Sequence, residues 1–306
     1  MFYKLRSSLL ITILSTQGIA FVSASVSVTT DSIKIAYGED NRVETYDAAE
    51  SLQRLAHSTA GMIKNIKLVP VKNHYIMPPA TLSKEMRVCK GEKFSSQPSS
   101  VICSGFLVGK DLLVTAGHCI LTKEDCESSS WVFDYKVNLD TKRADIMIPK
   151  SRVFKCKEVI ESKLEVTAGN AQDYSLIKLD RVVEGRTPLK FRKRGKVRYA
   201  QKLNVIGHPS GLPQKITTGG KVFRNSNQGY FVTNLDTFGG NSGSAVFNAT
   251  TNEVEGILVR GAKDYIEDPS LGCHIVNNEV EDISNRPDLG ESVSRITNIK
   301  ALMGKI

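Results

Sequence analysis

Two short segments of the chain carry residue types that could perform nucleophilic chemistry together. His118 follows an apolar run in the segment Thr-Ala-Gly-His-Cys, and Ser242 is surrounded by glycines in Gly-Gly-Asn-Ser-Gly-Ser. A serine hydroxyl is a poor nucleophile at neutral pH unless a neighbouring base takes its proton and a third group orients that base. Asp173, at the head of the segment Asp-Tyr-Ser-Leu-Ile-Lys-Leu, could be that third group. The three residues predict acyl transfer through an activated serine.

The elements that must position these residues are short apolar runs, which dominate the chain from about residue 100 onward. Gly, Pro, Asn and Asp separate the runs, and many short strands at such intervals predict a β-sandwich or a β-barrel. Each of the three candidate residues lies close to the end of a run. The runs are Val101–Val108, Leu112–Thr115, Trp131–Val137, Tyr174–Leu179, Leu203–Gly207, Tyr230–Val232, Ser244–Phe247 and Val254–Val259.

The two ends of the chain differ from this pattern. A basic start, the mostly apolar stretch Leu9–Val22 and small residues at Val22-Ser23-Ala24 predict a signal peptide over residues 1–24, and hence a secreted (extracellular or periplasmic) protein. Residues 25–34 are rich in Ser, Val and Thr and are expected to be flexible or part of a propeptide. No other segment reaches the length of a membrane span. At the C-terminal end, apolar residues every third position predict an amphipathic helix. They are Val293, Ile296, Ile299 and Leu302.

The formal net charge of +9 owes much to one basic cluster of six residues. No aromatic stacking platform or recognition helix accompanies the cluster, so we expect a solvated strand edge and turn, and no nucleic-acid partner. The aromatic content of 7% and the charged content of 24% are typical of a soluble globular protein. The cluster consists of Lys190, Arg192, Lys193, Arg194, Lys196 and Arg198.

The six cysteines of an exported chain are candidates for disulfides rather than for metal ligands. No pair has the C-x-x-C spacing, and the five histidines are scattered along the chain. We therefore expect neither a metal nor a cofactor.

The segment from Cys103 to Gly109, followed by Leu112 to Cys119, closely resembles the trypsin and chymotrypsin superfamily of serine proteases. The order His, Asp, Ser is also the order of that superfamily. The resemblance implies an all-β fold of two six-stranded antiparallel β-barrels, here with a C-terminal helix, and a site in the cleft between them. It also implies a disulfide between Cys103 and Cys119 that closes the hairpin carrying the histidine.

The resemblance assigns a role to each candidate residue. Ser242 would attack the peptide carbonyl, His118 would act first as base and then as acid, and Asp173 would orient the imidazole. The amides of Gly240 and Ser242 would form the oxyanion hole, where the loss of one donor costs about 10²–10³ in rate. Ser244 is a second hydroxyl in the same loop, but it lies where the strand resumes, so we expect it to pack.

Asn241 replaces the aspartate of the vertebrate enzymes, which makes the loop similar to the bacterial branch that includes the glutamyl endopeptidases. The segment 35–42, Ile-Ala-Tyr-Gly-Glu-Asp-Asn-Arg, resembles the N-terminal segment of mature enzymes in that branch. The peptidase domain is therefore predicted over residues 35–306, with residues 56–100 as an insertion before the histidine hairpin. Because Asn241 carries no charge, activation through an ion pair at this position is not expected.

The substrate-binding residues are predicted from their distance to Ser242. Asp236 falls six residues before Ser242, where trypsin-like enzymes place the carboxylate that binds Arg or Lys. Thr237 follows it, and the opposite wall would be formed by residues 256–261, among them Val259, Arg260 and Gly261. Glutamyl enzymes have a histidine in that wall where this chain has Leu258, although Arg260 could replace it as a cation. The sequence thus leaves preferences for basic and for acidic residues both open and favours basic ones.

The remaining cysteines admit three pairings, of which we predict Cys126 with Cys156 and Cys89 with Cys273. The chain as a whole is predicted to be a monomeric, secreted serine endopeptidase that acts on polypeptides without a cofactor. A catalytically silent homologue that binds proteins through the same cleft is the alternative. An esterase is disfavoured, because the serine lacks the strand–turn–helix context of Gly-x-Ser-x-Gly hydrolases.

Overall fold

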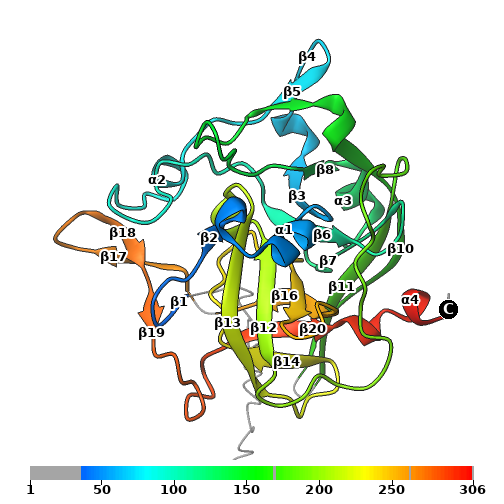
Figure 1. Cartoon of the computed structure of the whole chain (residues 1–306), viewed down its shortest axis with the longest axis vertical. Coiled ribbons are helices and arrows are strands. Elements are labelled where there is room, and N and C mark those ends of the chain that lie inside the picture. Colours follow the sequence, from blue (N-terminus) through cyan, green and yellow to red (C-terminus); the bar gives the residue numbers. More distant parts are fainter. Residues whose placement is uncertain (1–35, 168–169, 262, 305–306) are drawn as a thin grey trace, which may run out of the picture. The chain divides into compact units, whose positions relative to one another are not determined.

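The computed structural model describes residues 36–304, apart from 168–169 and 262 (Figure 1). These residues belong to one structural unit. The predicted signal peptide over 1–24 and the segment 25–34 lie outside the described residues. Within the described part of the chain, no helix combines the length and apolar character needed to cross a bilayer.

Six antiparallel strands between residues 59 and 179 close into a barrel in the order β10-β11-β7-β6-β3-β8. Apolar residues occur in these strands at alternating positions or in unbroken runs, because one face of each strand must line the barrel interior. The strands are β3 (Thr59–Lys64), β6 (Cys103–Leu107), β7 (Leu112–Thr115), β8 (Ser129–Phe133), β10 (Val153–Thr167) and β11 (Asn170–Leu179).

A second barrel follows in the order β12-β15-β16-β20-β14-β13, and a pairing between β12 and β13 closes it. Strand β2 (Val43–Glu44) extends this sheet beside β13. The two antiparallel six-stranded barrels confirm the predicted fold. The strands are β12 (Lys202–Gly207), β13 (Lys215–Arg224), β14 (Tyr230–Thr233), β15 (Ala245–Asn248), β16 (Val254–Arg260) and β20 (Glu291–Arg295).

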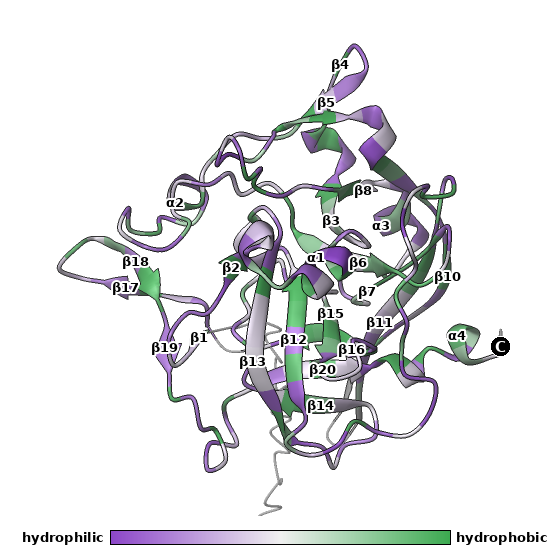
Figure 2. Cartoon of the chain, viewed as in Figure 1, coloured by the Kyte–Doolittle hydropathy of each residue, from purple (hydrophilic) through white to green (hydrophobic). Residues whose placement is uncertain are grey.

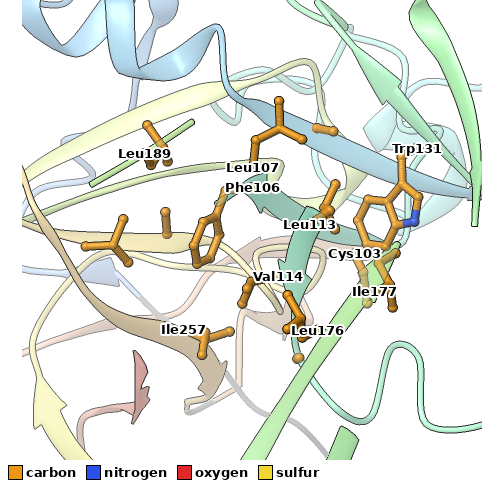
Figure 3. Close-up of a cluster of buried hydrophobic side chains, with 14 of the residues drawn as sticks. Cys103, Phe106, Leu107, Leu113, Val114, Trp131, Leu176, Ile177, Leu189 and Ile257 are labelled. Carbon is orange, nitrogen blue, oxygen red and sulfur yellow. The ribbon is translucent and has the colours of Figure 1, made fainter. Parts of the chain in front are cut away.

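One apolar cluster fills the first barrel and continues into the second (Figure 3). Phe106 and Trp131 of the first barrel and Ile257 of the second are fully buried in it. Burial of each such side chain contributes roughly 1.5–3 kcal/mol. Gly105 leaves room for the indole, since a Cβ there would lie 2.6 Å from Trp131 and 2.7 Å from Leu113. Figure 2 shows apolar residues over much of β12 and hydrophilic residues over much of the connecting loops.

Smaller elements surround the barrels. The additional strands are β1 (Ala36–Tyr37), β4 (Val69–Val71), β5 (His74–Ile76), β9 (Met147–Pro149), β17 (Tyr265–Asp268), β18 (Cys273–Val276) and β19 (Asn278–Glu279). The α-helices are α1 (Glu50–Ala56), α2 (Leu82–Glu85), α3 (Lys123–Glu127) and α4 (Lys300–Met303). The 3₁₀ helices are η1 (Thr45–Asp47), η2 (Asn65–Lys67), η3 (Lys150–Arg152), η4 (Pro209–Gly211) and η5 (Ile296–Asn298).

Two predicted boundaries differ from the structure. The insertion expected over 56–100 begins only after β3, because β3 pairs with β6 and β8 as a strand of the first barrel. The predicted C-terminal helix is present as the short helix α4, but Val293 belongs to β20 and Ile296 to η5. An apolar residue at every third position suits a strand end followed by a 3₁₀ turn as well as it suits an α-helix.

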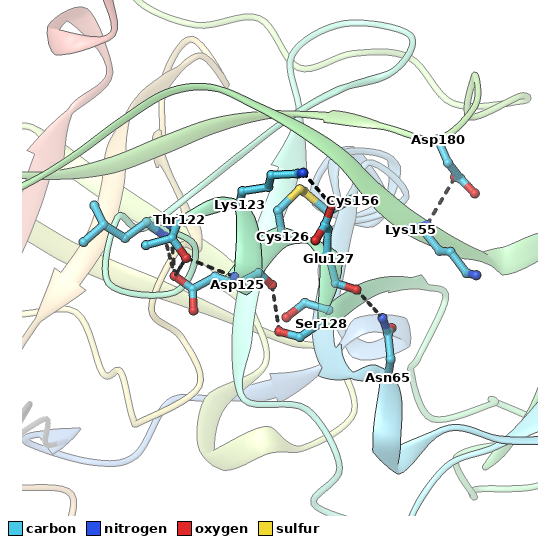
Figure 4. Close-up of a disulfide and its surroundings, with 12 residues drawn as sticks. Asn65, Thr122, Lys123, Asp125, Cys126, Glu127, Ser128, Lys155, Cys156 and Asp180 are labelled. Carbon is cyan, nitrogen blue, oxygen red and sulfur yellow. Dashed lines mark hydrogen bonds and ion pairs between the residues drawn. A yellow bond between two sulfur atoms is a disulfide. The ribbon is translucent and has the colours of Figure 1, made fainter.

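Three disulfides are present: Cys103–Cys119, Cys126–Cys156 and Cys89–Cys273. All three predicted pairings are therefore confirmed. Figure 4 shows that the second bridge joins helix α3 to strand β10. Thr122 caps α3: its hydroxyl accepts the N–H of Asp125, whose carboxylate accepts the Thr122 N–H. This capping box fixes the first turn of a helix too short to be stable alone.

Candidate active site

Strands β6 and β7 form the hairpin that leads into His118. The Thr115 hydroxyl donates to the carbonyl of Ser104 at 2.7 Å, and the Cys103–Cys119 bridge joins the start of β6 to the residue after His118. Gly117 lies so close to β10 that a Cβ would overlap the carbonyl oxygen of Lys163. The backbone on both sides of His118 is thereby fixed.

Asp173 holds His118 through both of its carboxylate oxygens. Nδ1 of His118 lies 2.8 Å from Oδ2, and the backbone N–H of His118 donates to Oδ1 at 3.1 Å. An ionised carboxylate can only accept hydrogen bonds, so the proton of the neutral imidazole lies on Nδ1 and Nε2 keeps its lone pair. The side chain of Asp173 is 2% exposed and that of His118 is 28% exposed. The acid is therefore shielded from water while the imidazole stays accessible.

Ser242 belongs to the loop between β14 and β15, and this loop is seated on the histidine hairpin. The Ser242 carbonyl accepts the N–H of Ser104 at 2.7 Å and lies 3.7 Å from Sγ of Cys119. That sulfur is in turn within 4.8 Å of a ring nitrogen of His118. The two segments identified from the sequence therefore lie in contact. The grouping of Cys103, His118 and Cys119 is no metal site, because sulfurs joined in a disulfide are not thiolates.

Two glycines allow this seating. Gly243 has φ +89°, and a Cβ at this position would overlap the carbonyl oxygen of Ser104 and the Thr115 hydroxyl. Gly240 has φ +86°, and its Cβ would meet the carbonyl oxygen of His208 at 2.5 Å. Both positions require the left-handed backbone that only glycine adopts without strain. The two glycines thus let the backbone of the serine loop lie close to the neighbouring segments.

The peptide between Gly239 and Gly240 is held through its own carbonyl and through both neighbouring peptides. The Gly239 N–H donates to Asp264 Oδ2 at 2.7 Å, and the Gly239 carbonyl accepts the N–H of Ser210. The Ser104 hydroxyl donates to the Gly240 carbonyl at 2.8 Å. Because a trans peptide is planar, the Gly240 N–H points away from Ser210, opposite to the Gly239 carbonyl. A fixed N–H of this kind can bind developing negative charge.

The other hydroxyl and the other histidine near the site have structural roles. Ser244 is fully buried and its hydroxyl donates to Asn241 Oδ1 at 3.2 Å, in agreement with the expectation that it packs. His208 is buried, and burial lowers its pKa to about 4, so its ring is neutral. Its Nδ1 lies 3.0 Å from the carbonyl of Leu212, and its backbone N–H donates to the Ser104 hydroxyl. Ser104, which the sequence reasoning missed, therefore connects His208 with Gly240.

Asp236 is bound by backbone groups from near the start of the described chain. Its carboxylate accepts the backbone N–H groups of Tyr37 at 2.6 Å and of Asn41 at 3.0 Å, and the residue is 1% exposed. Burial raises the pKa of Asp236 to about 6, although the two N–H donors oppose the shift. The sequence could not reveal this role, because the two donors lie about two hundred residues upstream of Asp236 in the chain.

The other predicted substrate-binding residues lie around the end of β16. Thr237 is buried and its hydroxyl donates to the carboxylate of Glu291. Val259 packs fully buried in the apolar core, so only its backbone can face a substrate. Arg260 is half-buried, and Gly261 abuts Glu291 so closely that a Cβ would overlap the carboxylate. Thr237 and Gly261 thus both lie against Glu291.

A model of the trypsin-like peptidase domain family matches residues 103–257, just over half of the chain. The match begins at the first cysteine of the histidine hairpin and extends beyond the serine loop. Among the curated proteins, none matches the chain.

Several solved structures are similar to this chain. A Glu endopeptidase in complex with MPD has a TM-score of 0.50 and 16% identity, over 87% of this chain and 96% of that one. An inactive mutant of the Mycobacterium tuberculosis protein Rv3671c has a TM-score of 0.47 and 11% identity, over 89% and 96% of the two chains. A serine endoprotease from Yersinia pestis has a TM-score of 0.47 and 14% identity, over 83% of this chain and 65% of that one. At such identities the Glu endopeptidase indicates the fold alone.

Proposed function

Because the chain belongs to the family of trypsin-like peptidases, we propose that it is a secreted serine endopeptidase that uses Ser242, His118 and Asp173. The observation that carries the proposal is the pair of hydrogen bonds between His118 and Asp173, at 2.8 and 3.1 Å, next to a serine loop seated on the same hairpin. Three disulfides and the predicted signal peptide support export to an oxidising compartment.

In the proposed reaction, Nε2 of His118 takes the proton of the Ser242 hydroxyl while Oγ attacks the substrate carbonyl. The tetrahedral intermediate collapses when the imidazolium donates that proton to the leaving amine, which produces an acyl-enzyme and a free amine. A water molecule then repeats the attack with His118 as base, and Ser242 leaves with its proton restored. Asp173 stabilises the imidazolium in both halves and stays ionised.

The amides of Gly240 and Ser242 are the proposed donors to the oxyanion. The Gly240 N–H is held by the contacts of Gly239 with Ser210 and Asp264. Donors fixed in advance stabilise the transition state without reorganisation during the reaction. Since the charge exists only in the transition state and the intermediate, these amides would act on kcat more than on KM.

Hydrolysis of an unstructured protein such as casein tests the proposal. We expect the matured wild type to cleave it and Ser242→Ala to lose at least about 10⁴-fold in rate, because the nucleophile is removed. Ser244→Ala is the matched control, and we expect it to lose less than about tenfold. An active Ser242→Ala variant would contradict the assigned nucleophile. A folded wild type that binds proteins without cleaving them would favour a catalytically silent homologue.

The predicted preference for basic residues can be weighed against the contacts of Asp236. A substrate cation would have to compete with the N–H groups of Tyr37 and Asn41 for a carboxylate that is 1% exposed. We therefore expect peptide amides ending in Arg, Glu and Phe to differ in kcat/KM by less than about a hundredfold, since the Asp236 carboxylate is already engaged. A preference for Arg above that value, lost in Asp236→Asn, would restore Asp236 as the specificity residue.

A further inference from the structure

The loop that supplies the Gly240 amide packs against a buried arginine, Arg42. This residue belongs to residues 37–42, called the N-terminal segment below. Arg42 is fully buried, and its guanidinium carbon lies 3.5 Å from the centre of the Phe238 ring. Phe238 is itself fully buried and stands two residues before Gly240. Its carbonyl accepts the N–H of Asn241 at 2.9 Å. The Phe238 ring therefore belongs to the same turn that carries the proposed oxyanion donor, the Gly240 amide.

The carboxylate of Asp40 orients the guanidinium. Nε of Arg42 donates to Oδ1 of Asp40 at 2.8 Å, and Nη2 donates to Oδ2 at 2.6 Å. This fork-to-fork geometry fixes the plane of the guanidinium as well as its position. A desolvated cation over an aromatic face attracts the ring with about 2 kcal/mol. The position of Phe238 is thus coupled to the backbone of residues 40–42.

The N-terminal segment is in turn held on several sides. Lys93 donates to the carbonyl of Asp40 at 2.9 Å and to the carbonyl of Arg42. The N–H groups of Tyr37 and Asn41 bind Asp236, two residues before Phe238. The segment therefore contacts the start of the loop through Asp236 and its middle through Arg42.

Stability alone gives no reason for a buried guanidinium at this place. A buried ion pair can often be replaced by apolar side chains of similar volume at no cost in stability, because removing the charges from water is unfavourable. What an apolar side chain cannot supply is the directional attraction to the ring and the fork to Asp40. A geometric role accounts for the burial of Arg42 despite the cost of removing its charge from water.

We propose that Arg42 is a positioning residue for the oxyanion donor, acting through Phe238 on the peptide between Gly239 and Gly240. The inference rests on the proposed function, because the donor matters only if the chain forms an oxyanion. Asn241 carries no charge, so an ion pair at that position cannot hold the loop. The contacts of Arg42 with Phe238, and of Asp236 with Tyr37 and Asn41, hold the serine loop instead.

The experiment compares Arg42→Met and Arg42→Lys with the matched control Arg186→Met. Arg186 also pairs with a carboxylate, Asp134, at 2.6 Å and also stacks over a phenyl ring, that of Phe133 at 4.7 Å, but it lies in the connector between the barrels. We expect Arg42→Met to lower kcat by about 30- to 1,000-fold with KM changed less than about threefold, because an oxyanion donor is displaced. Arg42→Lys should recover only part of this loss, and Arg186→Met should keep kcat within about threefold.

Hydrogen exchange provides a readout that does not depend on activity. Backbone amides of residues 236–242 should exchange faster in Arg42→Met and stay protected in Arg186→Met, with both variants folded. An unchanged kcat, or an equal change in KM, would overturn the proposal. If the wild type is inactive, the proposed function fails. In that case the loosened loop in Arg42→Met alone still supports Arg42 as the anchor, and unchanged exchange overturns it.

Discussion

At the scale of single residues, the site depends on how one carboxylate is shared. Asp173 uses one oxygen for the imidazole of His118 and the other for the backbone N–H of the same residue. Rotation of the ring would break the first bond while the second held the backbone in place. The Asp173 N–H donates to the Ser294 hydroxyl at 3.0 Å, which secures the acid from the second barrel. The histidine is consequently presented in one tautomer and one orientation.

His208, unlike the partly exposed His118, is buried, and this leads to a prediction about the pH dependence of stability. Its pKa is about 4 in the folded protein, because burial disfavours the charged ring, against an ordinary value of about 6.5 in the unfolded chain. Between these values the unfolded state binds a proton that the folded state does not, so stability falls as the pH falls. The resulting cost is absent above about pH 6.5 and nearly complete at about pH 4.

We therefore expect the wild type to lose roughly 3 kcal/mol more of its unfolding free energy than His208→Gln between about pH 7 and pH 4. Urea unfolding at both pH values measures the difference. Asp236, whose pKa is raised to about 6, has the opposite sign, but it is present in both proteins and cancels in the comparison. Equal losses in the two proteins would show that His208 is not held neutral.

The residue scale also shows where prediction from the sequence ends. His118, Asp173 and Ser242 were recognisable because their local motifs are specific. Asp236 was assigned by its distance in sequence from Ser242. That distance gives no information on Tyr37 and Asn41, which bind Asp236 from a distant part of the chain. Backbone donors leave no mark on a sequence, since every residue type except proline carries one.

At the scale of elements, the serine loop is fitted against the hairpin formed by β6 and β7. Gly243 is the closest point, where its positive φ and the nearness of Ser104 leave no space for a side chain. Gly185 offers a matched comparison, because it has φ +72° but no atom within 4 Å of the position that a Cβ would take. The two glycines separate backbone strain from steric exclusion.

We expect Gly185→Ala to cost about 1 kcal/mol of unfolding free energy, the strain of a left-handed alanine. Gly243→Ala adds overlap with the hairpin, so we expect a loss of at least about 3 kcal/mol together with most of the activity. Urea unfolding and casein hydrolysis measure the two effects. Equal stabilities of the two variants would mean that the loop is not seated as described.

The same scale explains which elements the sequence could predict. The strands of both barrels and the hairpin disulfide follow from short apolar runs and from a specific motif. The span 56–100 was assigned to an insertion as a whole, because the motifs that resemble the family lie at residues 35–42 and from residue 101 onward. The role of residues 37–42 was hidden for a different reason: the contacts of Arg42 with Phe238 connect two segments that no spacing rule relates.

At the scale of the whole molecule, neither barrel contains all three residues of the proposed triad. The first barrel supplies His118 and Asp173, and the second supplies Ser242. The barrels meet through the contacts of Ser104 with the serine loop and through the bond from Asp173 to Ser294. The proposed chemistry therefore requires both barrels to fold and dock, so the reactivity of Ser242 would report on the assembled molecule.

The most direct measurement is the mass-spectrometric location of the adduct formed with a fluorophosphonate probe. The wild type should carry one adduct on Ser242, Asp173→Asn should label more slowly by a factor of about 10³ or more, and Ser242→Ala should not label. An adduct on any other residue, or labelling that persists in Ser242→Ala, would contradict the claim that Ser242 is activated by His118 and Asp173.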